Sequence, residues 1–437
     1  MTLALQLLLS LSILIVLHEM GHFIPAKIFK TRVEKFYLFF DPWFSLVKKK
    51  IGDTVYGIGW LPLGGYVKIS GMVDESMDKD QLAKPPQPWE FRSKPAWQRL
   101  IIMIGGVTVN VILGFVIYWF VLAHWGYKVL PLENVTYGAH FEPVLEKIGF
   151  EDGDKILAVD DSIPQSHHQV MSMLFFDEAK KVTVERRGQK VEVNIPEDIS
   201  SRMLSAGARA AITPRYKCVI DSFTVKSPAD SAGLLKGDKI IGVNEVRSEF
   251  FMDIQQEIFK NKGKVIRVNF IRGDSTLVAK IKVSEEGAIG FYPVPDSKYL
   301  KYDTLQYSVG SAFPAAFRYA KEIIRKQVLS IRFLFSRAGV TQMGGFISIA
   351  NIFPDKWNWW AFWDKTALLS LVLAVMNILP IPALDGGHVI FLIWEVITGK
   401  PVKQRVLEVA QMFGFLLLIG LILWANGLDI FRLFSGN

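Results

Sequence analysis

The sequence predicts a polytopic α-helical membrane protein in which four transmembrane helices enclose a folded insert. The chain of 437 residues is too long for one core, and half of its residues are apolar. Runs of about 20 apolar residues, enough to cross a bilayer, lie near both ends of the chain. Residues 127–309 instead carry charges throughout, as ordinary soluble protein does.

The apolar runs define the predicted spans, at residues 3–24, 101–125, 365–394 and 412–424, the last extended toward residue 406. Clusters of lysine and arginine abut these runs at residues 27–50, 92–99 and 400–405. The positive-inside bias therefore predicts that the first helix runs from outside to inside and that the next three alternate. Both termini and the insert then lie outside the cytoplasm. A group of tryptophans precedes the third span, as an interfacial belt would: Trp357, Trp359, Trp360 and Trp363.

Cysteine content and charge exclude several classes of protein. The single cysteine, Cys218, excludes an internal disulfide and a cysteine-based metal cage. The net charge of +8 collects beside the spans, which indicates membrane topology and argues against a nucleic-acid partner. The first apolar run lacks a basic n-region and a small-residue cleavage site, so we interpret it as a retained helix.

The insert contains a repeat. Residues 149–159 match residues 233–243, 84 positions later, and each copy has a glycine-rich turn, an acidic residue and an apolar strand-like run. Both copies resemble PDZ domains, which bind extended peptides at a sheet edge. A loop for a C-terminal carboxylate is not evident, so the tandem either recognises peptides or excludes bulky ectodomains.

These patterns divide the chain into five regions. Residues 1–125 form an N-terminal membrane region, residues 126–205 and 206–295 form the PDZ-like domains, and residues 357–437 form a C-terminal membrane region. Residues 296–356 form amphipathic surface helices and a linker, although the helical pattern there also suits a plain helix packed on the insert.

The first span contains His18-Glu19-Met20-Gly21-His22. Residues four apart share a helix face, so both imidazoles can reach one cation, with Glu19 beside them to take a proton from water. Ionisable groups within a membrane are costly unless they are paired, coordinated or facing a wet cavity. The motif therefore predicts a metal site; the alternative is a polar patch where the helix leaves the membrane.

A catalytic zinc ion takes three protein ligands and keeps one position open. The third predicted span contains Asn377-Ile-Leu-Pro-Ile-Pro-Ala-Leu-Asp385-Gly-Gly, in which Pro380 and Pro382 break the helix. A broken helix at membrane depth occurs only inside protein or along a wet cavity. Asp385 is therefore the predicted third ligand, and His388 is its competitor. The predicted orientation places both motifs toward the cytoplasmic ends of their spans.

Together, the two motifs and the insert resemble the site-2 protease family over essentially the whole chain, and most closely its bacterial regulator-of-sigma-E subgroup. The resemblance implies zinc at His18, His22 and Asp385, with Glu19 as the catalytic base. It also implies membrane-spanning substrates, such as anti-sigma factors already trimmed outside and remnant signal peptides.

The resemblance further implies where substrate binds. Residues 63–69 match the family's membrane-reentrant β-loop, whose alternation around glycines could pair with an unwinding substrate strand; an ordinary hairpin is the alternative. In the family, the residue that corresponds to Asn377 engages the substrate backbone. The candidate substrate-binding residues are Asn377, Pro380, Pro382, Gly64, Gly65 and Tyr66.

Two departures from the family pattern leave subgroup and substrate preference open. The second span has Gly106-Val-Thr-Val-Asn110 where the family usually has Gly-Pro-x-x-Asn, and residues 345–347 read Gly-Phe-Ile where Gly-Pro-Ile is frequent. Neither position offers a metal ligand, so the expected chemistry is unchanged.

The complete expectation is a polytopic α-helical membrane protein with four transmembrane helices, a membrane-reentrant β-loop and an inserted tandem of two PDZ-like α+β domains. It binds Zn²⁺, resides in a bacterial inner membrane and cuts transmembrane segments of single-pass proteins. Its expected partners are these substrates, the bilayer, and peptides or ectodomains at the tandem. The alternative is a non-catalytic PDZ receptor or chaperone braced by zinc, which would not need Glu19.

Overall fold

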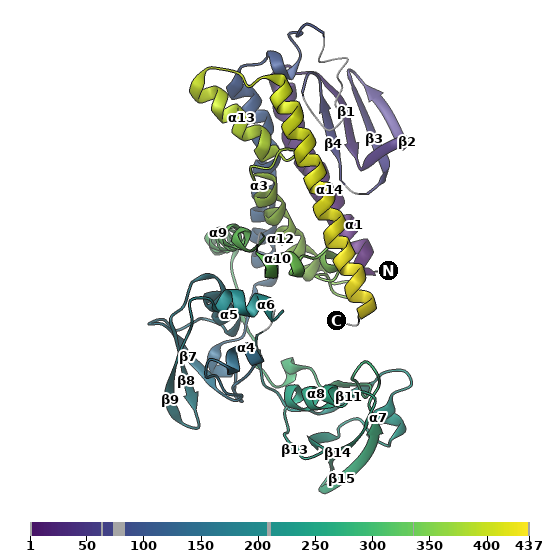
Figure 1. The fold of residues 1–437 in the computed structure, drawn as a ribbon, viewed down its shortest axis with the longest axis vertical. Helices are drawn as coiled ribbons and strands as arrows, with labels where there is room; N and C mark the ends of the chain where they lie inside the picture. The colour runs from purple at the N-terminus through teal and green to yellow at the C-terminus, as the bar shows by residue number, and fades with distance from the viewer. Residues whose placement is uncertain (1, 63, 73–83, 208–210, 335, 436–437) are drawn as a thin grey trace.

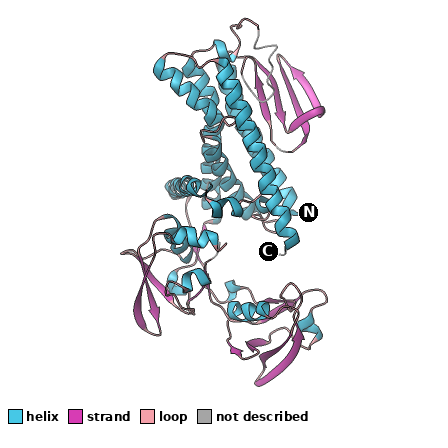
Figure 2. Cartoon of the chain, viewed as in Figure 1, coloured by secondary structure: helices cyan, strands magenta, loops and turns pink. Residues whose placement is uncertain are grey.

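The computed structural model describes residues 2–62, 64–72, 84–207, 211–334 and 336–435. A bundle of long helices forms one part of the molecule, and two lobes of short helices and small sheets form the other (Figures 1 and 2). Within the described residues, four helices are long and apolar enough to cross a membrane, which is the predicted number: α1 Thr2–Ile28, α3 Ala96–Trp125, α12 Trp359–Asn377 and α14 Gln404–Ser435.

The third predicted span is divided in the structure. α12 begins at Trp359 and ends at Asn377, and the next helix is α13, Asp385–Thr398. Pro380 and Pro382 lie in the break and lack the backbone N–H that a continuous helix needs. The predicted start at residue 365 was too late, because three of the four tryptophans expected ahead of the span lie inside α12.

α1 and α3 approach so closely that their backbones touch. A Cβ atom built on Gly105 would lie 1.9 Å from the carbonyl oxygen of Gly21, so no larger residue fits there. α12 packs on α3 as well, and the hydroxyl of Ser370 donates to the carbonyl oxygen of Asn110 at 2.7 Å. Small residues and interhelical hydrogen bonds thus fix these helices against one another.

A four-stranded sheet follows α1, in the strand order β2-β3-β1-β4. β1 is parallel to β3 and antiparallel to β4, which leaves β4 at one edge. Gly65, just before β4, lies against α1, where its Cβ would be 2.4 Å from Cγ2 of Ile15. The first residue of the predicted reentrant loop, Leu63, is outside the described residues. The strands are β1 Val33–Leu38, β2 Phe40–Ile51, β3 Thr54–Leu61 and β4 Tyr66–Ile69.

Two lobes with separate buried cores lie between α3 and α9 in the chain. The first contains β6 Ala139–Phe141, α4 Pro143–Glu146, β7 Lys155–Val159, α5 His167–Phe176, β8 Lys181–Arg186, β9 Gln189–Asn194, α6 Ile199–Ser205 and β10 Ile212–Pro214. The second contains β11 Ile220–Phe223, α7 Pro228–Ser231, β12 Lys239–Val243, β13 Val246–Arg247, α8 Phe251–Lys260, β14 Val265–Arg272, β15 Ser275–Lys282 and β16 Phe291–Pro293. Because β10 pairs with β6, the first lobe extends past the predicted boundary at residue 205.

The two lobes repeat one ion pair whose carboxylate is buried. In the first lobe, Arg186 donates to both carboxylate oxygens of Asp154, at 2.8 and 2.6 Å. In the second, Arg272 donates to both oxygens of Asp238, at 2.8 and 2.7 Å. The two aspartates are 84 residues apart, as the two copies of the sequence repeat are. The repeat therefore extends to equivalent side-chain contacts.

Polar side chains join the two lobes. Nε2 of His140 in the first lobe lies 3.1 Å from Nε2 of Gln256 in α8, and Nδ1 of His140 lies 2.7 Å from a carboxylate oxygen of Asp152. Arg215, in the connection, donates to Asp253 of α8 at 2.6 Å. His140, Asp152 and Asp253 are close enough to hold a metal ion, but the guanidinium of Arg215 already supplies a cation there.

α9, Val309–Leu334, lies between the bundle and the first lobe (Figure 1). Its buried alanines, among them Ala312 and Ala316, pack against α3. Arg325 pairs with Asp177 of the first lobe at 2.7 Å. The strand that follows α3, β5 Tyr127–Val129, pairs with the strand that precedes α9, β17 Asp303–Leu305. Two short helices follow α9: α10 Arg337–Gln342 and α11 Phe346–Ala350.

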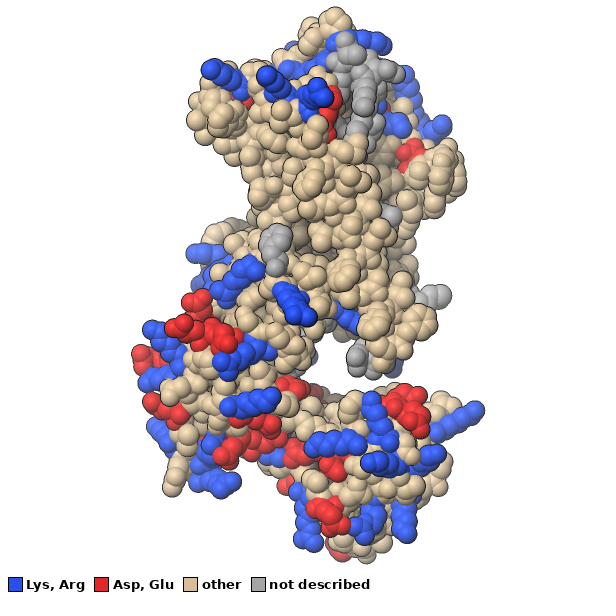
Figure 3. Space-filling model, in the orientation of Figure 1, with Lys and Arg blue, Asp and Glu red and all other residues tan. Residues whose placement is uncertain are grey.

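Charged side chains gather at the two ends of the molecule (Figure 3). Lysines and arginines lie at the end of the bundle that carries α13 and the β1–β4 sheet, and charges of both signs cover the lobes, with a largely uncharged band between them. The three basic clusters of the sequence border this end of the bundle, because α1 ends at Ile28, α3 begins at Ala96 and α14 begins at Gln404.

Candidate metal centre

Three side chains from distant parts of the sequence converge between α1 and α13. His18 and His22 lie one turn apart on α1, and their Nε2 atoms are 3.4 Å apart. Asp385, the first residue of α13, places Oδ2 3.4 Å from each of these nitrogens. The three atoms form an equilateral triangle of possible metal ligands. The structure thus brings together the three residues that the sequence motifs single out.

The dimensions of this triangle suit zinc. A tetrahedral zinc ion at about 2.0–2.1 Å from its nitrogen and oxygen ligands separates them by about 3.3–3.4 Å. Oδ2 of Asp385 is buried and has no hydrogen-bond partner among the described residues. A buried carboxylate oxygen without a donor is costly unless a cation faces it. Two imidazoles and one carboxylate therefore fit a zinc ion that keeps one coordination position open.

α3 orients both imidazoles. Nδ1–H of His22 donates to the carbonyl oxygen of Ile102 at 2.8 Å, which leaves Nε2 free to bind a cation. The side-chain amide of Asn110 lies 3.2 Å from Nδ1 of His18. An asparagine amide presents either its oxygen or its nitrogen by rotation, so Asn110 can accept a proton from Nδ1. Gly106 leaves room for the rings, because its Cβ would lie 2.4 Å from Nε2 of His22.

Glu19 lies beside the triangle and is not one of its corners. It follows His18 on α1, and the backbone N–H of Val67 in β4 donates to its carboxylate. The stem of Glu19 packs on Gly65, where a Cβ would lie 3.6 Å from Cγ of Glu19. The carboxylate is therefore held between α1 and the edge strand, next to the possible metal ligands.

Asn377 lies at the rim of the triangle. It is the last residue of α12, and its Nδ2 is 3.3 Å from Nε2 of His18. The chain then turns tightly before α13, and Gly386 makes this turn possible, because its Cβ would lie 2.2 Å from the carbonyl oxygen of Leu379. The turn brings the carboxylate of Asp385 back to the histidines.

The other predicted substrate-binding residues occupy different surroundings. Pro380 is exposed in the loop before α13, and the carbonyl oxygen of Pro382 faces Gly414 of α14, whose Cβ would lie 1.7 Å from it. Gly65 lies beside Glu19, and Gly64 lies against Phe40. The ring of Tyr66 stacks between aromatic side chains of the sheet and its hydroxyl donates to a carboxylate at 2.7 Å, so this side chain supports the sheet: the partners are Tyr37, Phe40 and Asp41.

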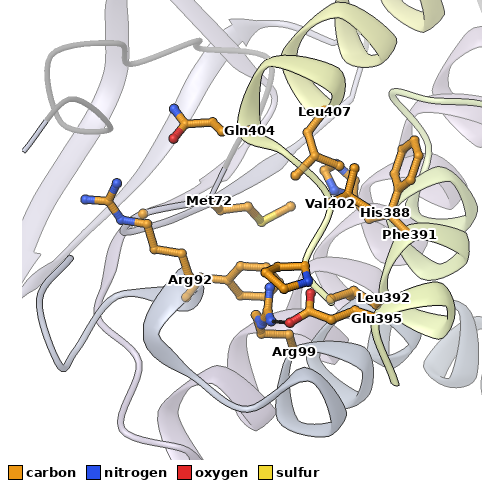
Figure 4. Close-up of a pocket in the computed structure, with 13 residues that line it drawn as sticks. Met72, Arg92, Arg99, His388, Phe391, Leu392, Glu395, Val402, Gln404 and Leu407 are labelled. Carbon is orange, nitrogen blue, oxygen red and sulfur yellow. Dashed lines mark hydrogen bonds and ion pairs between the residues drawn. The ribbon is translucent and has the colours of Figure 1, made fainter. Parts of the chain in front are cut away.

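His388, the competing ligand, is not one of the three residues of the triangle. It lines a pocket of about 270 Å³ between α13, α14 and the start of α3. Figure 4 shows this pocket, with an ion pair between Arg99 and Glu395 on its wall. His388 is three residues after Asp385 on α13. Both side chains therefore lie near the start of this helix, but only Asp385 takes the third position of the triangle. The geometry therefore favours Asp385 as the third ligand.

The sequence reasoning missed the contribution of α3. Gly106 and Asn110 were noted only as the ends of a segment that departs from the family pattern at Val107, yet they contact His22 and His18. These two residues are four apart and therefore lie on one face of a helix, which was the only sequence signal that they act together. It could be interpreted only once α3 was known to pack on α1.

Comparisons with known proteins identify the family. The model of peptidase family M50 matches residues 6–421. The chain is 28% identical to the regulator of sigma-E protease RseP of Escherichia coli, over 98% of this chain and 97% of that protein. It is 26% identical to the regulator of sigma E protease of Haemophilus influenzae, over 98% of each, and 26% identical to a Neisseria meningitidis protein named as a zinc metalloprotease, over 98% of this chain and 99% of the relative.

The matched region contains both motifs and the whole insert, so it covers the three residues that meet at the triangle. The resemblance to site-2 proteases, expected from these motifs, is thereby confirmed. The chain belongs to peptidase family M50.

Proposed function

We propose that this protein is an intramembrane zinc metalloprotease that hydrolyses peptide bonds within transmembrane segments of single-pass membrane proteins. One observation carries the proposal: two histidines of α1, a helix of membrane-spanning length, meet an aspartate at the start of α13 at 3.4 Å spacings, with a glutamate beside them. A site of this composition in a membrane bundle serves chemistry or transport, because ionisable groups there are otherwise costly.

The role of each residue follows from its contacts. His18, His22 and Asp385 hold the zinc ion, and Asn110 and the Ile102 carbonyl orient the two imidazoles. Zinc, when bound, supplies a Lewis acid for the peptide carbonyl and makes water more acidic.

Glu19 moves the proton. It accepts a proton from the attacking water and returns it to the nitrogen of the cleaved peptide bond, so that the two products leave as a carboxylic acid and an amine. Its carboxylate is suited to this because it lies beside the metal ligands and is not one of them. The backbone donor from β4 keeps it in place.

Substrate must lose its helix before cleavage, because a helix hides its carbonyls in its own hydrogen bonds. As an edge strand of the sheet, β4 offers a pairing partner for the unwound segment, and it adjoins Glu19 through Gly65 and Val67. Added as a further strand, the substrate would pass the triangle in extended form. Asn377, at the rim, would then engage the substrate backbone.

The protein lies in a bacterial inner membrane, with both termini and the two lobes on the periplasmic side. The basic clusters at the opposite end of the bundle support this orientation, since positive residues stay in the cytoplasm. The triangle is then nearer the cytoplasmic side. The lobes, as PDZ-like domains, would contact peptides or ectodomains before the substrate enters.

Substrate identity is proposed at the level of class. Two relatives are named as regulators of sigma E, which supports trimmed anti-sigma factors as substrates, with remnant signal peptides as a second group. Both present one short transmembrane helix without a bulky outer domain.

The test is to map the cut. Purified protein in detergent is incubated with a tagged single-pass substrate whose ectodomain has been shortened, and the products are sequenced by mass spectrometry. New termini inside the apolar segment, lost in Asp385→Asn together with bound zinc, support the proposal. A cut outside that segment, or one that persists in Asp385→Asn, would refute it.

A further inference from the structure

We infer that Gln411 of α14 is a positioning residue for the metal centre, acting through the backbone of Ala383; the inference rests on the proposed function. Gln411 is 5% exposed. Its Oε1 accepts a hydrogen bond from the backbone N–H of Ala383 at 3.1 Å. Ala383 is two residues before Asp385.

Ala383 has a backbone conformation that needs support. Its φ is +79°, in the left-handed region that alanine avoids because its Cβ approaches the backbone. It also lies in the non-helical loop between α12 and α13, where a backbone N–H without a partner at membrane depth is costly. Gln411 supplies that partner, so the hydrogen bond and the left-handed turn depend on each other.

α14 meets the loop through a small contact surface. Gln411 and Gly414 are three residues apart and face the same way, and a Cβ on Gly414 would lie 1.7 Å from the carbonyl oxygen of Pro382. Neighbouring residues of α14 face outward instead, since Met412 is 43% and Phe413 65% exposed. Figure 1 shows α14 running along the bundle from the end that carries α13. The close approach at Gly414 therefore brings Gln411 within reach of the loop.

The short loop couples the backbone conformation of Ala383 to the position of the Asp385 carboxylate. On its other side the turn is closed by glycine, because a Cβ on Gly387 would lie 2.6 Å from the carbonyl oxygen of Ile381. Leu384 N–H bonds to the same carbonyl at 3.0 Å. With little freedom left between Ala383 and Asp385, a change of φ at Ala383 moves the start of α13 and with it the carboxylate.

The experiment measures zinc affinity by chelator competition, and cleavage as separate kcat and KM, on the full chain in detergent. Gln411→Leu is expected to lower zinc affinity and kcat about 10-fold, as loss of an outer-shell contact does, with KM within about twofold. Gln411→Glu keeps a side chain of the same length that ends in an acceptor oxygen. This variant is expected to retain most of the zinc affinity and most of kcat. Phe413→Leu, on the outward face, is the matched control and leaves both unchanged.

Rescue distinguishes positioning from general packing. Glycine adopts φ +79° without strain, so Ala383→Gly combined with Gln411→Leu is expected to recover most of the zinc affinity. Wild-type zinc affinity in Gln411→Leu would overturn the inference, and so would a double variant no better than Gln411→Leu. If the wild type binds zinc and cuts no substrate, the proposed function fails, while zinc affinity still decides the role of Gln411.

Discussion

Replacing Gly106 with alanine should damage the metal centre although Gly106 binds no metal. The added Cβ would lie 2.4 Å from Nε2 of His22 and 2.6 Å from Cε1 of His18, where ordinary contact begins at 3.4 Å. One imidazole, or all of α3, must therefore move by about 1 Å. α3 cannot slide along α1 to make room, because the two backbones already touch at Gly105.

The size of the effect follows from this displacement. A misplacement of about 1 Å costs on the order of 100-fold in rate, and disturbed support of a metal ligand costs about 10–100-fold in affinity. We expect Gly106→Ala to lose at least about 10-fold in zinc affinity and about 100-fold in kcat/KM. Chelator competition and cleavage of a single-pass substrate measure the two quantities.

Gly114→Ala is the matched control. It lies on the same helix, and its Cβ would meet the end of the Leu371 side chain at 2.6 Å, away from the histidines. Overpacking lowers stability by about 1–3 kcal/mol at either site, so both variants should unfold at lower temperature, but Gly114→Ala should keep its zinc. Equal zinc affinity in Gly106→Ala and wild type would refute the argument.

Three further predictions concern other contacts. Asn110→Leu removes the amide beside Nδ1 of His18 and should lower zinc affinity about 10-fold; unchanged affinity by chelator competition contradicts the assigned orientation. Gly65→Ala should press the chain beside β4 away from α1 and lower kcat about 10–100-fold while zinc stays bound, as metal analysis would show; loss of zinc instead would contradict separate roles for the strand and the metal ligands. At the lobe junction, burial lowers the pKa of His140, but the hydrogen bond with Asp152 and the negative charges of Asp152, Asp253 and Glu142 together outweigh burial and raise the pKa above 6.5. The protonated His140 therefore stabilises the fold below about pH 6.5, and this stabilisation is lost as pH rises through the raised pKa. The stability of the wild type relative to His140→Gln should fall as pH rises above about 6.5, and a stability difference that does not change with pH, measured by thermal melting, would contradict this.

The convergence of His18, His22 and Asp385 was predictable because it depends on local geometry. His18 and His22 are four residues apart on a helix, so they must share a face. Pro380 and Pro382 must end a helix shortly before Asp385. Charge placement along the chain then put both motifs at the same end of their spans.

Contacts that depend on how two helices cross were not predictable from one sequence. Asn110 reaches His18 only because α3 packs backbone to backbone on α1. The left-handed conformation of Ala383 is likewise set by tertiary contacts, since alanine itself disfavours it. The pairing of β10 with β6, a strand far earlier in the chain, depends on tertiary contacts in the same way.

The most direct test of the proposed function compares wild type with Glu19→Gln. Both proteins are purified in detergent, their zinc is quantified, and both are incubated with the same shortened single-pass substrate. The geometry predicts equal zinc, since Glu19 is not a corner of the triangle, and cleavage by the wild type alone, since the amide cannot take a proton from water. Equal zinc with equal cleavage would show that Glu19 is not the base and would contradict the mechanism.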